Sequence, residues 1–100
     1  MKTIYKYAVP LKDTFTINLP KGYTILSVGV QNVVSFDRRS QSPYIWVLID
    51  TENVKNSKPV NFRLAGTGHP IEEYSFLRFI GTFQLQDGAL VFHLFEILDA

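Results

Sequence analysis

Residues 79–95 read F-I-G-T-F-Q-L-Q-D-G-A-L-V-F-H-L-F, and this stretch decides the fold class. Its two ends are rich in aromatic and β-branched residues, which favour strands. Between them stands Asp87-Gly88, and an Asp-Gly pair between two apolar runs is a strong signal for a β-hairpin. The sequence therefore predicts two antiparallel strands joined by a tight turn at this pair.

Alternation of apolar and polar residues extends the β pattern to the rest of the chain. Residues 14–19 read T-F-T-I-N-L and residues 60–67 read V-N-F-R-L-A-G-T, and residues 26–36 alternate as well. Such alternation is typical of strands with one buried face. Residues 44–49, Y-I-W-V-L-I, are apolar on both faces. We expect that strand to meet the core on one face and a second sheet or a partner subunit on the other.

The sequence predicts a single all-β domain over residues 1–100, a small antiparallel β-sandwich or barrel of about seven strands. The strands are expected at residues 3–9, 14–19, 24–36, 44–50, 59–67, 77–85 and 89–97. The polar residues 37–43 and 53–59 are predicted loops. At most one short helical turn is expected, at residues 71–77, because this segment follows Pro70 and carries two glutamates near its N-terminus.

The composition excludes several classes of protein. A chain of 100 residues forms one domain, too small to hold a cofactor domain beside a substrate domain. The lack of cysteine excludes disulfides, iron–sulfur clusters and thiol nucleophiles, and with only 2 histidines we expect neither a metal nor a cofactor. The 10 Lys and Arg residues nearly balance 9 Asp and Glu residues and form no basic stripe. We therefore expect no binding to nucleic-acid polymers.

The chain is apolar for so small a domain, and this indicates that it forms a homo-oligomer. Hydrophobic residues make up 46% of the sequence and charged residues 19%. The first ten residues lack the apolar segment of a signal peptide, and no apolar run reaches the length of a membrane-spanning helix. We therefore expect a cytoplasmic protein that makes no contact with a membrane.

The densest candidate site follows the strand that contains Arg63. Gly66 and Gly68 permit positive φ, so that backbone N–H groups can converge on an anion. Thr67 and His69 add polar side chains, and alternation places Arg63 and Thr67 on one face. This stretch is a candidate phosphate site. The alternative is a structural corner in which the two glycines only turn the chain.

Other candidates lie on neighbouring strands. Gly81 interrupts a strand, which predicts a β-bulge or a close backbone approach, and Arg78 and Thr82 beside it are candidates to assist in holding an anion. Trp46 or Tyr44 would stack on the base of a nucleotide. The alternative for Trp46 is a place in the core or in an interface between subunits.

Three further features have simpler interpretations. His93 lies within an apolar strand and is interpreted as a core or interface histidine. His69 with Glu72 or Glu73 would form an acid–base cluster, but the sequence shows no third partner, so no catalytic residue is predicted. Arg38-Arg39 is either a solvated loop tip or a phosphate clamp.

Three segments resemble a family of small bacteriophage proteins. They are G-T-G-H-P-I at residues 66–71, I-G-T-F-Q-L at residues 80–85 and G-A-L-V-F-H-L-F-E at residues 88–96. The opening M-K-T-I, the L-S-V at residues 26–28 with Gln31-Asn32, and Trp46 fit the same pattern. The resemblance covers most of the chain, and residues 33–44 look like an insertion. The family has no assigned function and implies no catalytic residues.

What the resemblance implies is a setting in an infected bacterium, where small phage proteins often blunt immunity. One such device is an oligomeric, non-catalytic "sponge" that sequesters cyclic nucleotide signals. Our first hypothesis is therefore a homo-oligomer that binds an anionic nucleotide without being an enzyme. Its ligand would be held by Arg63, Thr67, Gly68, His69, Arg78, Thr82, Trp46 and Tyr44. The alternative is a protein–protein interaction module, an inhibitor of a host enzyme or a virion accessory protein. A small hydrolase ranks below both.

Overall fold

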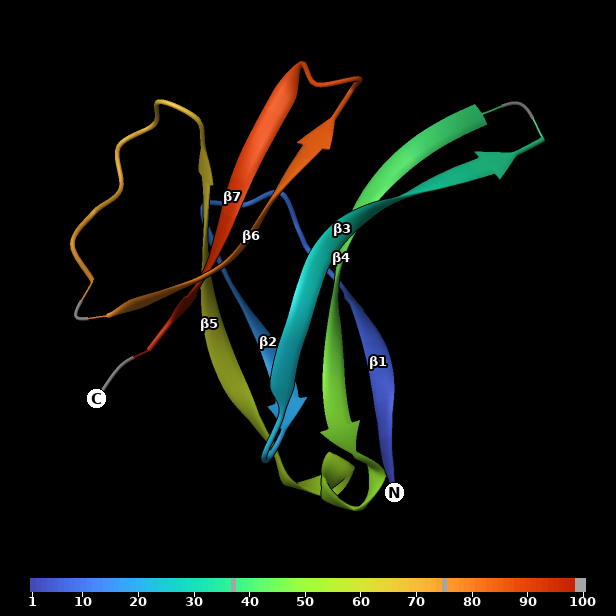
Figure 1. Ribbon diagram of the computed structural model, residues 1–100, viewed down its shortest axis with the longest axis vertical. Helices are drawn as coiled ribbons and strands as arrows, with labels where there is room; N and C mark the ends of the chain where they lie inside the picture. The colour runs from blue at the N-terminus through green and yellow to red at the C-terminus, as the bar shows by residue number, and fades with distance from the viewer. Residues whose placement is uncertain (37, 75, 99–100) are drawn as a thin grey trace.

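The computed structural model describes residues 1–36, 38–74 and 76–98. Seven strands and one 3-10 helix occur in these residues (Figure 1). The strands are β1 (Lys2–Ala8), β2 (Thr14–Pro20), β3 (Thr24–Ser35), β4 (Arg38–Asp50), β5 (Ser57–Gly66), β6 (Leu77–Leu85) and β7 (Leu90–Ile97), and the helix is η1 (Thr51–Asn56). The predicted all-β fold class is confirmed.

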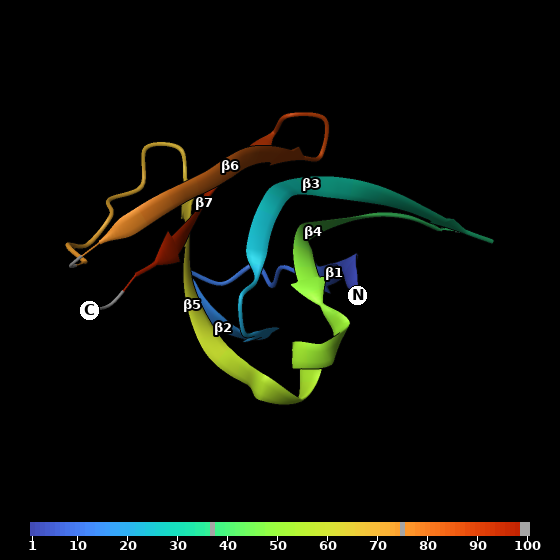
Figure 2. The same cartoon turned by 60° about the horizontal axis from the view of Figure 1, so that its bottom comes forward.

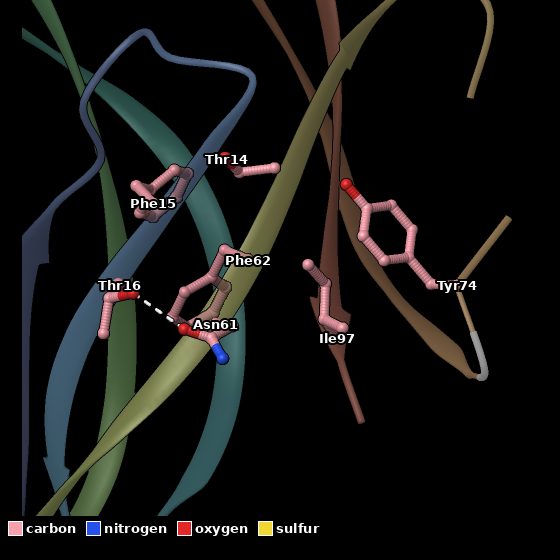
Figure 3. A pocket seen from close by; sticks show the side chains of 7 residues that line it. All are labelled: Thr14, Phe15, Thr16, Asn61, Phe62, Tyr74 and Ile97. Atoms are coloured by element: carbon pink, nitrogen blue, oxygen red, sulfur yellow. Dashed lines mark hydrogen bonds between the residues drawn. The ribbon is translucent and has the colours of Figure 1, made fainter. Parts of the chain in front are cut away.

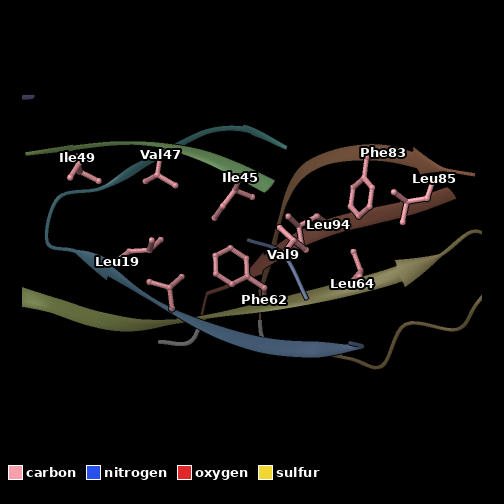
Figure 4. Close-up of a cluster of buried hydrophobic side chains, with 11 residues drawn as sticks. Val9, Leu19, Ile45, Val47, Ile49, Phe62, Leu64, Phe83, Leu85 and Leu94 are labelled. Atoms are coloured by element: carbon pink, nitrogen blue, oxygen red, sulfur yellow. The ribbon is translucent and has the colours of Figure 1, made fainter. Parts of the chain in front are cut away.

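The strands form two antiparallel sheets that pack face to face. Sheet A has the order β1-β4-β3 and sheet B the order β2-β5-β7-β6. Figure 4 shows Ile45, Val47 and Ile49 of β4 pointing toward Leu19 and Phe62 of sheet B. Burial of these side chains supplies most of the favourable free energy of folding. The buried apolar cluster consists of Val9, Leu19, Ile45, Val47, Ile49, Val60, Phe62, Leu64, Phe83, Leu85 and Leu94.

The predicted hairpin between β6 and β7 is confirmed, with Asp87-Gly88 at the centre of its turn. The N–H of Ala89 donates to the carbonyl of Gln86 at 3.0 Å. The φ angles of Asp87 and Gly88 are 54° and 89°. Positive φ at both central positions is the signature of a type I′ turn, which matches the twist of the strands that it joins.

The predicted helical turn at residues 71–77 is wrong. Residues 71–74 and 76 are not helical, β6 begins at Leu77, and Ser75 lies outside the described residues. The 3-10 helix η1 instead follows β4, where the carboxylate of Asp50 accepts a hydrogen bond from the N–H of Glu52 at 3.0 Å and caps it. Within the part of the chain that the structure describes, no helix is long and apolar enough to cross a membrane.

The predicted loop at residues 37–43 is also wrong, because β4 begins at Arg38 and pairs with β3 from Ser35 onward. Asp37 lies outside the described residues. Polar side chains hold this part of the ladder together, since Gln41 Nε2 donates to Asn32 Oδ1 across the strands at 3.0 Å. The β3–β4 hairpin projects away from the rest of the molecule (Figure 2).

A β-bulge interrupts β6 between Phe79 and Gly81, as the glycine predicts. A Cβ at position 81 would lie only 2.8 Å from Cγ1 of Val28 on β3. The close approach that this glycine permits is therefore to a core side chain of the other sheet. The bulge also changes which β6 side chains face outward and are therefore available to bind a ligand.

Candidate ligand-binding site

The turn that follows β5 has backbone donors that are already engaged. The N–H of His69 donates to the carbonyl of Gly66 at 3.0 Å, and the N–H of Thr67 donates to the carbonyl of Val91 at 3.2 Å. Gly68 has the predicted positive φ of 84°, as the third position of a type II turn requires. Two of the backbone N–H groups expected in the predicted phosphate cradle, those of Thr67 and His69, therefore already bind carbonyls of the protein.

Gly66 leaves space for the ring of His69 and does not adopt a positive φ angle. It is absent from the positive-φ residues, whereas a Cβ at this position would lie 2.9 Å from the ring of His69. The imidazole of His69 therefore packs over the end of β5. It is exposed on the other side. The glycine and the histidine of this turn fit together as a pair.

Arg63 is buried and fully engaged, unlike the solvent-facing ligand contact that the sequence suggested. The residue is 3% exposed. Its guanidinium donates to Glu72 Oε2 at 3.1 Å and to the carbonyls of Pro70 at 3.0 Å and Asp13 at 3.3 Å, and also to the carbonyl of Leu64. These bonds hold the segment after β5 against the outer face of sheet B. A ligand would have to displace that segment to reach Arg63.

Glu72 is not available for the acid–base cluster suggested for it with His69. The Glu72 carboxylate is committed to Arg63, while the His69 ring lies against Gly66. A hydrogen bond from its own backbone N–H lowers the pKa of Glu72, burial opposes this, and the bond from Arg63 lowers it further. This carboxylate is therefore a weak base, held in place by a cation.

Two of the predicted residues, Thr67 and Thr82, are brought together by His93, which was interpreted as a core or interface histidine. Thr67 Oγ1 lies 2.8 Å from His93 Nε2, and Thr82 Oγ1 lies 2.9 Å from His93 Nδ1. The strand order explains the contact, because β7 lies between β5 and β6 and His93 pairs with Ala65 and with Thr82. Both threonines are exposed and the histidine is half-buried. We call Thr67, His93 and Thr82 the hydroxyl–imidazole cluster.

This cluster can serve as a donor to an anion. A neutral imidazole has one N–H and one acceptor nitrogen, so one threonine hydroxyl accepts from the ring and the other donates to it. The accepting hydroxyl of the pair keeps its own proton free for a ligand. A hydroxyl donor of this kind can bind an oxygen of a phosphate group.

A groove of about 240 Å³ adjoins the cluster at Thr67. Gly66, Thr67 and His69 line one side, and residues 89–92 line the other. The groove therefore brings the turn after β5 next to the first residues of β7. Among the described residues, no three His, Asp or Glu side chains are placed to bind a metal ion together.

Tyr44 and Trp46 lie on the opposite side of the molecule from the cluster. They alternate along β4 with the core residues Ile45 and Val47, and so they face outward from sheet A. Their rings meet edge to face with centroids 6.3 Å apart, and Trp46 Cζ3 would lie 3.2 Å from a Cβ at Gly29. Within one chain they cannot stack on a base whose phosphate binds at the cluster.

Arg78 is also separate from the cluster, because it pairs with Glu96 on the inner side of sheet B. Its Nη1 lies 3.9 Å from Glu96 Oε1, and the Glu96 side chain is 3% exposed. The hydroxyl of Tyr23 donates to the other oxygen of this buried carboxylate. Burial first, and then the bond to Glu96, raise the pKa of Tyr23 well above its ordinary value. This group is satisfied internally.

The sequence matches the family model described as a domain of unknown function (DUF7352) over residues 1–99. The chain belongs to this family. No curated protein and no solved structure is significantly similar to the chain. Family membership brings no activity with it, so the function has to be argued from the contacts of Thr67, His93 and Thr82.

A second hollow lies on sheet B beneath Tyr74, with a volume of about 390 Å³. Figure 3 shows Tyr74 facing Ile97, with Thr14, Thr16 and Asn61 beyond it. The hydroxyl of Thr16 donates to Asn61 Oδ1 at 2.7 Å. None of the predicted site residues lines this hollow.

The side chains of Arg38 and Arg39 lie outside the described part of the structure. The prediction of a phosphate clamp at these two residues therefore also lies outside it.

Proposed function

We propose that the protein binds and sequesters an anionic nucleotide, of the class of cyclic nucleotide immune signals, and releases it chemically unchanged. It acts as a homo-oligomer in the cytoplasm of a bacterium infected by a phage. The observation that carries this proposal is the hydroxyl–imidazole cluster. Two exposed hydroxyls held by one imidazole form a compact set of hydrogen-bonding groups on the surface of sheet B.

The chemistry of the cluster favours a phosphate group on a small molecule. Hydrogen bonds to a charged group contribute about 1.5–3 kcal/mol each. The net charge of +1 gives no extended positive surface for a polymer. A single phosphate that reaches one or two hydroxyl donors needs no such surface.

The group that orients the His93 imidazole favours binding of the ligand over its chemical conversion. A hydroxyl next to an imidazole resembles a nucleophile and its base, and such pairs are usually completed by a third group that orients the base. Here that third position is taken by Thr82, which carries no negative charge to stabilise an imidazolium. Thr67 is therefore better suited to donate a hydrogen bond than to attack a phosphate.

Apolar side chains on the outer face of sheet A support the homo-oligomer. Ile4 is 53% exposed and Leu26 is 47% exposed, and both lie near Trp46 on the strands that flank β4. A stable interface buries roughly 800 Å² on each partner. We expect this face to supply much of that area.

Heating the loaded protein tests the proposal. Purified protein is incubated with a panel of cyclic dinucleotides, washed, and heated to release what it holds. We expect intact ligand from the wild type, at least about tenfold less from a Thr67→Val/Thr82→Val variant, and an unchanged amount from Thr16→Val. Thr16 is a matched control because it is an exposed threonine on the same face of sheet B. Recovery of degraded ligand, or of none, would contradict sequestration.

A second function, a protein–protein interaction module, is favoured by the projecting β3–β4 hairpin. Phe36 at its tip is fully exposed and Val34 is 71% exposed. Exposed apolar side chains on a projecting element are typical of a contact surface. If this is the function, a Val34→Ser/Phe36→Ser variant loses the protein's effect in the infected bacterium. The Thr67→Val/Thr82→Val variant keeps that effect. Sequestration predicts the reverse.

A further inference from the structure

The bulge in β6 places two side chains on one face that a regular strand would separate. Phe79 pairs with Phe95, and Thr82 pairs with His93. Phe79 and Thr82 are three positions apart on β6, whereas their partners Phe95 and His93 are two positions apart on β7. Positions separated by three residues face opposite sides of a regular strand. The register shift between Phe79 and Gly81 turns both Phe79 and Thr82 to the outer face.

The consequence is an aromatic surface directly beside the hydroxyl–imidazole cluster. The rings of Phe79 and Phe95 have centroids 5.5 Å apart, and Phe79 is 57% exposed. Phe95 and His93 are two residues apart on the same face of β7, a separation of about 7 Å. Neighbouring exposed apolar side chains rimmed by polar groups are typical of a binding surface. Bulges are common beside functional sites because they redirect side chains in this way.

We propose that Phe79 and Phe95 form the stacking platform for the base of the ligand whose phosphate binds at Thr67, His93 and Thr82. This inference rests on the proposed function and specifies its ligand as a nucleoside phosphate. The separation of about two strand residues matches the distance from a phosphate to the base within one nucleotide. Phe79 thus takes the role that the sequence suggested for Trp46 or Tyr44, which face the other side of the molecule.

The platform selects a single nucleotide unit over a longer strand. Aromatic stacking accepts any base, whereas polymer binders add a positively charged groove that follows the backbone. Arg63 pairs with Phe95 across the sheet on this face, but its guanidinium is already bound to Glu72. A single base on Phe79 and one phosphate at the hydroxyl–imidazole cluster would therefore occupy both the aromatic and the hydrogen-bonding groups of this face.

Calorimetric titration with two probes separates the platform from the phosphate site. Adenosine monophosphate carries both a base and a phosphate, and ribose phosphate lacks the base. We expect the wild type to bind adenosine monophosphate roughly five- to a hundredfold more tightly than ribose phosphate, the range of one stacked base. Phe79→Ala should remove that difference and leave ribose phosphate binding unchanged. Phe36→Ala, which changes an exposed phenylalanine at the tip of the β3–β4 hairpin, should change neither affinity.

The remaining outcomes distinguish the two proposals. Equal affinity of the wild type for both probes, or an unchanged affinity of folded Phe79→Ala for adenosine monophosphate, would overturn the platform and leave the phosphate site standing. A wild type that binds neither probe, or a Thr82→Val variant that binds both as tightly as the wild type, would overturn the phosphate site and the platform together. Circular dichroism of each variant confirms that it is folded.

Discussion

Replacement of Arg63 by alanine should loosen the segment after β5 and destabilise the whole domain. Three backbone carbonyls, those of Asp13, Leu64 and Pro70, would each lose a hydrogen bond, in addition to the Glu72 carboxylate, and the Asp13 carbonyl would keep the bond from the N–H of Leu64. At about 1 kcal/mol for each hydrogen bond to a carbonyl, the loss comes to roughly 3 kcal/mol. For a domain of this size, that corresponds to a fall in Tm of about 12–24 °C. This expectation replaces the view that Arg63 is a free ligand contact.

Differential scanning calorimetry measures the fall in Tm, and limited proteolysis locates it. We expect new cleavage within residues 67–74 of Arg63→Ala. Arg63→Lys should lie between the wild type and alanine, because lysine keeps the charge but not the planar fork of donors. Glu72→Gln should have the smallest effect, since the carboxylate is 66% exposed. If Arg63→Ala melts within ~5 °C of the wild type and gains no cleavage site, Arg63 does not anchor this segment.

Three further changes test other parts of the structure. Tyr23→Phe removes the donor to the buried Glu96 carboxylate and should lower the free energy of unfolding, measured in urea, by about 1–3 kcal/mol. Because the pKa of Tyr23 is raised in the folded protein, the stability that Tyr23 contributes is complete below about pH 10 and is lost as the pH rises further. A stability difference between the wild type and Tyr23→Phe that persists unchanged in strong alkali would refute this assignment. Gly81→Ala places a Cβ 2.8 Å from Val28 and should destabilise by about 1–3 kcal/mol, whereas a stable variant would show that β3 can move aside. Gly88→Val forces a side chain into a φ of 89° and should cost about 1–3 kcal/mol, with no change in Tm expected only if the turn can rearrange.

Most of the strands could be predicted from the sequence because their signals are local. Alternation marks β2, β3 and β5, and Asp87-Gly88 marks the turn between β6 and β7. The first residues of β4 were missed because they are polar on both faces and show no alternation. The two glutamates after Pro70 suggested a helix start, but Glu72 binds Arg63, and the described residues of this segment are not helical.

The candidate site could be predicted only in part, because its contacts depend on the order of the strands. Thr67 and Thr82 were identified separately, and the sequence does not show that β7 lies between their strands. His93 could have been placed by alternation, since Leu94 beside it faces the core and His93 must then face outward. Phe79 could not be placed in this way, because the bulge reverses the alternation that would locate it.

The central claim, that an anionic nucleotide binds at the hydroxyl–imidazole cluster, is tested most directly by following the histidine ring resonances by NMR during titration with a cyclic dinucleotide panel. The chain has 2 histidines, so a His69→Gln variant assigns the signals of His93. We predict that at least one member of the panel shifts the His93 resonances saturably, and that the Thr67→Val/Thr82→Val variant shows no such shift. Saturable binding that leaves the His93 resonances unmoved, or no binding by any member of the panel, would contradict the claim.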